Sequence, residues 1–252
     1  MDSIITVITE EPQLKDPILI EGLPGVGNVG KLAAEHLLAN IEAVKFADIY
    51  SKHFPPQVVL DEECVVNMVN NEVYYAKDVG GGKDLIILVG DYQGLTPEGQ
   101  YELSNHVIQM CMGFNVKTVY TLGGYGVGKI VESPRVLGAV TSVDMKEGLE
   151  EHGVVFSSGE PGSGIVGASG LLLGLSKIYG IEAACLMGET SGYFVDPKGA
   201  EAVLRVLNSI IGLEMDMTEL ETKAEQVDQI TSKIKDMETS QEPSREDLHY
   251  IG

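Results

Sequence analysis

Short apolar runs alternate with stretches of helical spacing over residues 1–212. Residues 17–21 (PILIE) and 84–89 (DLIILV) are almost continuously apolar, which is typical of strands that are buried on both faces. Between them, residues 31–40 place Leu32, Leu37 and Leu38 at the spacing of one helix face. This alternation predicts an α/β domain whose mostly parallel sheet is flanked by helices.

The same rhythm continues to Gly212. The further strands predicted are residues 4–8, 117–122, 137–141, 154–156 and 181–186. The further helices predicted are residues 97–112, 144–152, 171–179 and 197–211. Thr96 precedes Pro97 and is expected to cap its helix, since Thr is a favoured N-cap and Pro a favoured first helical residue.

An Asn pair interrupts the pattern in the first half of the chain. Residues 64–69 and 72–77 resemble strands, and Asn70 and Asn71 lie between them. Asn tolerates a positive φ better than most residues, so this arrangement predicts a two-residue hairpin. A hairpin here would make the sheet mixed.

The composition changes after Gly212. Residues 213–252 carry eleven Asp or Glu and four Lys or Arg, a net charge of −7. Apolar residues recur every seven positions at Leu213, Leu220, Val227 and Ile234. The pattern predicts an acidic amphipathic helix over 213–240, and it leaves open whether the apolar seam packs on its own domain or on another chain.

The last twelve residues, 241–252, form a third region. The segment TSQEPSRED is polar and is expected to be flexible, and the chain then ends in LHYIG. The sequence thus divides into an α/β domain (1–212), a helix (213–240) and a flexible tail (241–252) with a small apolar tip.

Composition narrows the function. The formal net charge of −21 argues against nucleic acid and against anionic membrane surfaces as partners. No run is long and apolar enough to span a membrane, and the N-terminus lacks the pattern of a signal peptide. The three cysteines predict no disulfide framework and are interpreted as buried hydrophobic residues. A cytoplasmic protein is expected.

A glycine-rich segment follows the first buried strand. Gly25, Gly27, Asn28, Gly30 and Lys31 belong to a G-x-G-x-x-G-K sequence that opens a predicted helix. The spacing matches a dinucleotide-binding loop, with Asp48 as the candidate ribose ligand. It also approaches a P-loop, but Leu32 replaces the Ser or Thr that holds Mg²⁺. The alternative is a tight turn whose glycines permit close packing.

Other small or polar residues follow later strands. They include Gly124, Gly126 and Gly128 after one strand, and Glu189 and Thr190 after another. Loops that follow parallel strands gather at the carboxyl edge of a sheet. There they form a ligand pocket, a flat surface for a partner, or ordinary turns with no further role. The histidines are scattered, so no metal site, cofactor or catalytic group is predicted.

Three segments together resemble the archaeal proteasome-assembly-chaperone family. They are ILIEGLPGVGNVGKLAAEHL, YTLGGYGVGKIVESPRV and GIVGASGLLLGLSKIYGIEAACLMGETSGYFVDPKGAEAVL. The resemblance covers about residues 16–213, and the acidic helix and short apolar tip are also similar. It implies a single phosphorylase-like or Rossmann-like domain, homo-oligomers and no catalysis.

The resemblance also implies a partner, the α-subunits of the 20S proteasome. The family's C-terminal peptide, a hydrophobic residue followed by Tyr and any last residue, docks between these subunits. Here Tyr250 is third from the end and Ile251 takes the usual Tyr position, so the expected contacts are Leu248, Tyr250, Ile251 and Gly252. The alternative function is a small-ligand or nucleotide-binding enzyme that acts at the glycine-rich loops.

Overall fold

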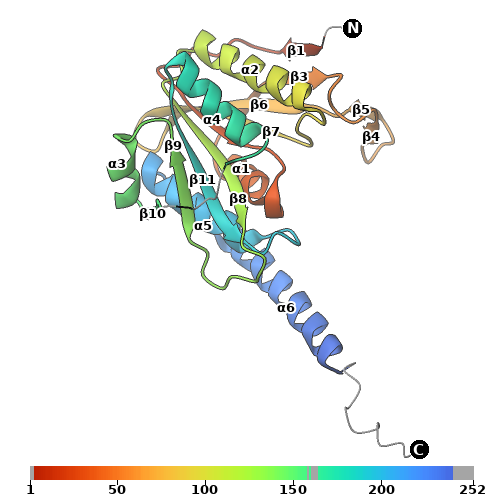
Figure 1. Ribbon diagram of the computed structural model, residues 1–252. Helices are drawn as coiled ribbons and strands as arrows, with labels where there is room; N and C mark the ends of the chain where they lie inside the picture. The colour runs from red at the N-terminus through yellow and green to blue at the C-terminus, as the bar shows by residue number, and fades with distance from the viewer. Residues whose placement is uncertain (1–2, 158, 160–163, 241–252) are drawn as a thin grey trace, which may run out of the picture.

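A mixed β-sheet with helices on both faces forms the body of the protein (Figure 1). The computed structural model describes residues 3–157, 159 and 164–240, and side chains only as far as residue 231. Within this part of the chain, nine strands form one sheet in the order β1-β3-β6-β7-β2-β8-β11-β9-β10. The strands are β1 (Ile4–Ile8), β2 (Ile18–Gly22), β3 (Val44–Ser51), β6 (Asn71–Val79), β7 (Lys83–Gly90), β8 (Thr118–Gly126), β9 (Val136–Val140), β10 (Val154–Val155) and β11 (Glu182–Thr190).

The centre of the sheet is parallel. Strands β7, β2, β8 and β11 run in one direction, while β6, β3 and β1 continue the sheet by antiparallel pairing on one side. On the other side β9 pairs antiparallel with β11. The expected α/β fold with a mixed sheet is therefore confirmed.

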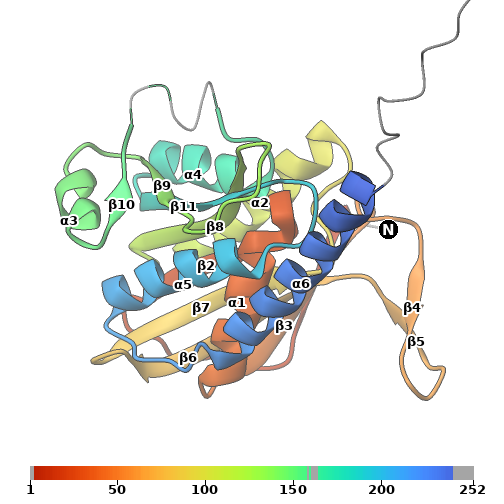
Figure 2. The ribbon, with the colours of Figure 1, turned by 90° about the horizontal axis from the view of Figure 1, so that it is seen from below.

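Helices cover the two faces of the sheet. On one face lie α1 (Val29–Asn40) and α5 (Pro197–Ile211), and on the other lie α2 (Pro97–Gly113) and α4 (Ala168–Tyr179) (Figures 1 and 2). The short α3 (Met145–Glu151) lies beside β10 at the edge of the sheet. The final helix, α6 (Thr218–Ser240), packs on α5.

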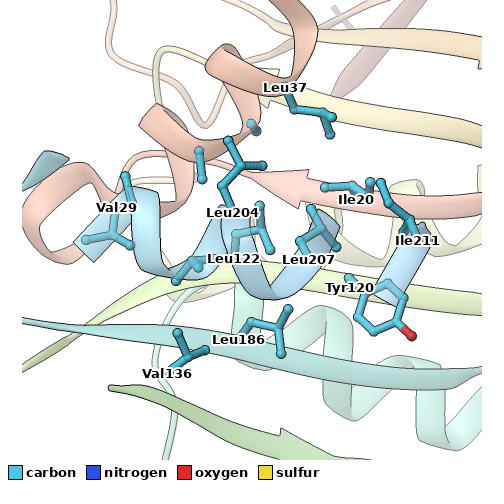
Figure 3. Packing of buried hydrophobic residues seen from close by; sticks show 14 of the residues in the cluster. Ile20, Val29, Leu37, Tyr120, Leu122, Val136, Leu186, Leu204, Leu207 and Ile211 are labelled. Atoms are coloured by element: carbon cyan, nitrogen blue, oxygen red, sulfur yellow. The ribbon is translucent and has the colours of Figure 1, made fainter. Parts of the chain in front are cut away.

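Each face has its own apolar core. Ile20, Leu122 and Leu186 point toward α1 and α5 and pack with Leu37 and Leu207 (Figure 3). Leu19, the neighbour of Ile20, belongs to the core on the opposite face. Because successive side chains of a strand point to opposite faces, a strand covered on both sides is apolar at nearly every position.

Two predicted helix starts match the structure. The Thr96 hydroxyl accepts a hydrogen bond from the Gly99 amide at 3.1 Å, and α2 begins at Pro97. The Asp196 carboxylate caps α5 in the same way, at 3.0 Å from the Gly199 amide. Strands β8 and β11 are longer than predicted and include Gly124, Gly126, Glu189 and Thr190, which the sequence had placed after the strands.

The predicted hairpin at Asn70 and Asn71 is wrong. Asn71 is the first residue of β6, which pairs with β3 and β7 rather than with the preceding strand. The turn before β7 is formed by Gly80, Gly81 and Gly82, which all have positive φ. Neither Asn has a positive φ, and Asn71 is extended within β6. Glycine adopts the left-handed conformation of such a turn at low cost.

The strand before Asn70 belongs to a separate two-stranded hairpin. Strands β4 (Val58–Leu60) and β5 (Val66–Met68) pair only with each other and extend beyond the sheet (Figures 1 and 2). Their turn is stabilised by Asp61, whose carboxylate accepts hydrogen bonds from the Glu63 and Val65 amides. We refer to residues 56–68 as the arm.

Candidate functional site: the carboxyl edge of the sheet and the root of the last helix

The glycines of the G-x-G-x-x-G segment bring α1 into direct contact with the sheet. A Cβ at Gly30 would lie 2.1 Å from the carbonyl oxygen of Leu122 in β8. A Cβ at Gly22 would lie 2.3 Å from the Cβ of Ala34 in α1. The lack of side chains at these positions therefore permits a helix-to-strand contact that any larger residue would push apart.

The loop before α1 is covered by the end of β11. Gly27 has a positive φ, and a Cβ there would meet the Thr190 hydroxyl at 2.8 Å. The Gly27 carbonyl accepts a hydrogen bond from the Asp196 amide at 2.8 Å. A Cβ at Gly124 would lie 2.2 Å from the carbonyl oxygen of Val26. Protein atoms thus occupy the space on the side of this turn that faces β8 and β11.

Other requirements of a nucleotide site are not met by the described residues. Lys31 does not lie free beside the loop, because its Nζ is 3.4 Å from Asp91 and 3.5 Å from Glu35. Asp48 is on β3, which is separated from β2 by β6 and β7, and it binds Lys45 and Asn70. Asn28 adopts a left-handed conformation in the 3-10 turn before α1. Gly25 is on the open side of this turn, where a Cβ would have no other atom within 4 Å. This geometry favours packing as the role of the motif.

Glu189 joins two strands at the same edge. Its carboxylate accepts hydrogen bonds from the Arg135 amide and Nε, both at 3.0 Å, and forms an ion pair with the guanidinium. The guanidinium holds the pKa of Glu189 below its usual value. The Thr190 hydroxyl accepts a hydrogen bond from the Gly192 amide. These side chains connect β11 to the segment before β9 and to its own exit loop, so neither is aimed at a free space.

Glu21 is a titratable group that the sequence did not single out. It is fully buried near the end of β2, where its carboxylate accepts hydrogen bonds from the Leu23 amide and the Ser169 hydroxyl, both at 3.0 Å. Burial raises its pKa to about 7. In the sequence, Glu21 is a charged residue at the end of an otherwise apolar predicted strand, and no other feature distinguishes it.

The outer rim of this edge is apolar and open. Tyr193 is 78% exposed, and Val26 and Val195 are each nearly half exposed. Gly126 and Gly192, both exposed, adjoin Val26, since a Cβ on either would lie about 3.5 Å from its Cγ1. Gly128 is exposed too and lies near the Tyr193 hydroxyl. The rim is therefore a surface that a partner's backbone could approach closely.

The middle of helix α6 passes beside this rim, where Val227 and Thr231 face Ile130 and Phe194. Leu220 and Ala224 are buried against the domain, and Met217 is buried just before the helix. Asp228 pairs with Lys198 of α5 at 2.6 Å, and Glu221 pairs with Arg205 of α5 at 2.9 Å. The first part of the apolar seam thus packs on its own domain, which leaves only the later part for another chain.

A small gap lies between α6 and the rim. It has a volume of about 20 Å³, room for a single water molecule, and is lined by Ile130, Phe194, Val227 and Thr231 among others. One turn further, Ile230 is 59% exposed. The helix then runs away from the sheet (Figure 1). The residues after Asp228 in α6 correspond to about 18 Å of helix.

Leu248, Tyr250, Ile251 and Gly252 lie outside the described residues, so their expected role stays a prediction. Within the described part of the chain, no three His, Cys, Asp or Glu side chains converge as metal ligands. Nor does any helix there have the length and apolar character needed to cross a bilayer.

Comparison with known proteins finds a family that matches most of this chain. The model of the PAC2 family matches residues 19–235, which include the glycine-rich edge and most of α6. The chain belongs to the PAC2 family. Its relatives include the uncharacterised protein MJ1210 of Methanocaldococcus jannaschii, which is 41% identical and covers 95% of this chain and 93% of its own length.

Two solved structures of Pyrococcus furiosus proteins are similar over nearly the whole PAC2 fold. PbaB, described as an archaeal proteasome activator, is 41% identical with a TM-score of 0.87, over 93% of this chain and 100% of PbaB. PbaA, described as an archaeal homolog of proteasome-assembly chaperone, is 28% identical with a TM-score of 0.77. That match covers 95% of this chain and 94% of PbaA. The resemblance to archaeal proteasome-assembly chaperones is therefore confirmed.

Proposed function

We propose that this PAC2 protein is a non-enzymatic, homo-oligomeric chaperone or activator of the archaeal 20S proteasome, and that it binds the α-ring through its C-terminal tail. The observation that carries the proposal is the anchored, outward course of α6. Burial of Leu220 and two ion pairs to α5 fix the direction in which the helix leaves the domain. Similarity to PbaB and PbaA supplies the kind of partner.

The tail has the chemistry for such a contact. Leu248, Tyr250 and Ile251 provide apolar anchors, and the carboxylate of Gly252 provides a charge for a basic residue of the α-subunit. The polar segment before them supplies reach, and several tails on one oligomer would act together through avidity. The exposed rim around Tyr193 lies beside the middle of α6 and is available for a second contact.

Retention of purified α-rings on the immobilised protein tests the tail. A chain that ends at Glu246, and a full chain with Tyr250→Ser and Ile251→Ser, should each lose at least tenfold in retention. Ser244→Ala, a matched change in the polar segment, should retain α-rings as the wild type does. Equal retention by all four proteins would exclude the tail mechanism.

The alternative function, a nucleotide or small-ligand enzyme, has a separate test. A bound ligand at a hundredfold excess over its Kd stabilises a protein by about 2.7 kcal/mol. We expect no rise in Tm with ATP, NAD or phosphate, because Thr190, Asp196 and Gly124 pack against the glycine-rich turn. A clear rise with any of these compounds would favour the alternative.

A further inference from the structure

The arm is the most exposed part of the described chain that also carries many aliphatic side chains. Every residue from Pro56 to Met68 is exposed, while Phe54 and Val69, which lie on either side of the arm, are buried. The domain core therefore fixes both ends of the arm, but the arm itself does not lie on the domain (Figure 2).

One face of the arm is wholly aliphatic. In the antiparallel register Val58 lies opposite Met68, and Leu60 lies opposite Val66. Alternate residues of a strand share a face, as do directly opposite residues, so these four side chains form one continuous surface. Each of them is at least half exposed. The other face carries Val59 and Asn67.

Such a face is unfavourable in water. An isolated two-stranded hairpin is marginally stable at best, and it needs a third strand or a packed face for stability. The arm exposes between 42% and 64% of each of its large aliphatic side chains, and a contiguous apolar patch on a monomer is often a functional surface. The aliphatic face of the arm is therefore a candidate interaction surface, since it is exposed and not packed on the domain.

Charge indicates what that partner is. The chain carries a net charge of −21, so two copies repel wherever charged surfaces meet. Neither β4 nor β5 contains an ionisable residue, and the acids of the arm, Asp61, Glu62 and Glu63, are confined to its turn. A basic partner would be recognised by this acidic turn and would not require an uncharged face. The strands of the arm are where two like-charged copies meet with least repulsion.

We infer that the aliphatic face of the arm, formed by Val58, Leu60, Val66 and Met68, packs against a second copy of this chain. The inference rests on the self-association included in the proposed function, and it assigns that association to a surface distinct from α6 and the tail. Burial of the face stabilises the hairpin and the oligomer together, since each aliphatic side chain gains from leaving water.

Mass in solution tests the inference. Leu60→Asp and Val66→Asp change exposed side chains, so both variants should keep the wild-type circular dichroism spectrum. Either change should raise the dissociation constant of the oligomer at least tenfold and shift the mass at micromolar concentration toward the 27.1 kDa monomer. Val143→Asp is the matched control, because Val143 is 78% exposed outside the arm and should leave the mass unchanged.

The same variants separate this inference from the tail mechanism. The chain that ends at Glu246 should keep the mass of the wild-type oligomer while it loses α-rings. A wild-type monomer, or an unchanged oligomer in both arm variants, would overturn the inference and leave the tail mechanism to be judged by retention alone. An arm variant that keeps its oligomer but loses α-rings would show that the arm contacts the proteasome, and would also overturn it.

Discussion

Gly30 of α1 lies directly against the carbonyl group of Leu122 in β8. A methyl group at position 30 would be 2.1 Å from that oxygen, with the Gly123 amide nitrogen also close by. Both neighbours are backbone atoms of a central strand and cannot rotate away. The contact fixes how closely the helix approaches the sheet.

Gly30→Ala should therefore lower the free energy of unfolding by about 2–3 kcal/mol, the usual cost of overpacking a core. Gly174→Ala is the matched control, because Gly174 is exposed within α4 and a Cβ there meets nothing. It should raise stability by about 0.5–1 kcal/mol, since Ala favours helix over Gly. Urea unfolding of both variants measures the difference, and equal effects would contradict the packing role.

Glu21 should make stability depend on pH. Its pKa is raised from 4.5 to about 7, so the folded protein binds a proton that the unfolded chain releases between these values. The stability that protonation supplies is complete below pH 4.5 and is lost as pH rises through 7, a change of about 3 kcal/mol.

Glu21→Gln should flatten the unfolding free energy between pH 4.5 and 7. The amide retains an oxygen for the Leu23 N–H and offers a donor to the Ser169 hydroxyl. Glu62→Gln, an exposed acid in the arm, controls for the lost charge. Urea unfolding across this pH range is the measurement. A slope that persists in Glu21→Gln would assign the effect to another group.

The ion pair between Arg135 and Glu189 should stabilise the carboxyl edge. Glu189 is 7% exposed, so Arg135→Ala would leave a largely buried carboxylate without its main partner and should cost about 2–3 kcal/mol. Arg205→Ala removes two ion pairs of an arginine that is half exposed, and should cost less than about 1 kcal/mol. Thermal unfolding compares the two, and the opposite order would contradict a structural role for Glu189.

The ion pair between Arg135 and Glu189 should lose its stabilising effect in acid, whereas the contribution of Glu21 is lost as pH rises. The pKa of Glu189 is lowered from 4.5, so its contribution is present above pH 4.5 and disappears as pH falls through the folded-state value. The difference in stability between wild type and Arg135→Ala should therefore shrink in acid. A difference that stays constant to pH 2 would exclude an ionic origin.

Leu220 should determine whether α6 keeps its direction. It is 1% exposed, and Leu220→Ala should cost about 2–4 kcal/mol through loss of packing. Amide hydrogen exchange in α6 should become faster, and retention of α-rings should fall. Ile230→Ala, ten residues on and 59% exposed, should leave the exchange rates unchanged. Equal exchange in both variants would mean that the contact with α5 does not hold the helix.

The sequence predicts most of this fold because its elements are specified locally. The start of α2 is specified by Thr96, Pro97 and Gly99, which are close together in the chain. Continuous apolar runs likewise identify the strands that are covered on both faces. The pairing of strands depends on distant residues instead. The Asn70 and Asn71 prediction failed because β6 pairs with β3 and β7, while the strand before Asn70 pairs with β4 instead.

The site was harder to predict because glycines and carboxylates look alike in binding sites and in packing. Gly27 and Gly30 match a phosphate loop in spacing, and only the positions of Thr190 and Leu122 show what surrounds them. Cys64 was interpreted as a buried residue but is exposed on the arm, whereas Cys111 and Cys185 are buried as expected. Exposure of Cys64 followed from the course of the arm, which local pattern does not reveal.

The way the arm is attached has an evolutionary consequence. Phe54 and Val69 hold its two ends in the core, and the exposed residues between them make no part of that core. Lengthening such a segment has a small entropic cost, which grows only with the logarithm of its length. We therefore expect the turn between β4 and β5 to tolerate insertions and deletions among descendants of this gene, while the sheet beneath it and the four aliphatic side chains of the arm stay the same.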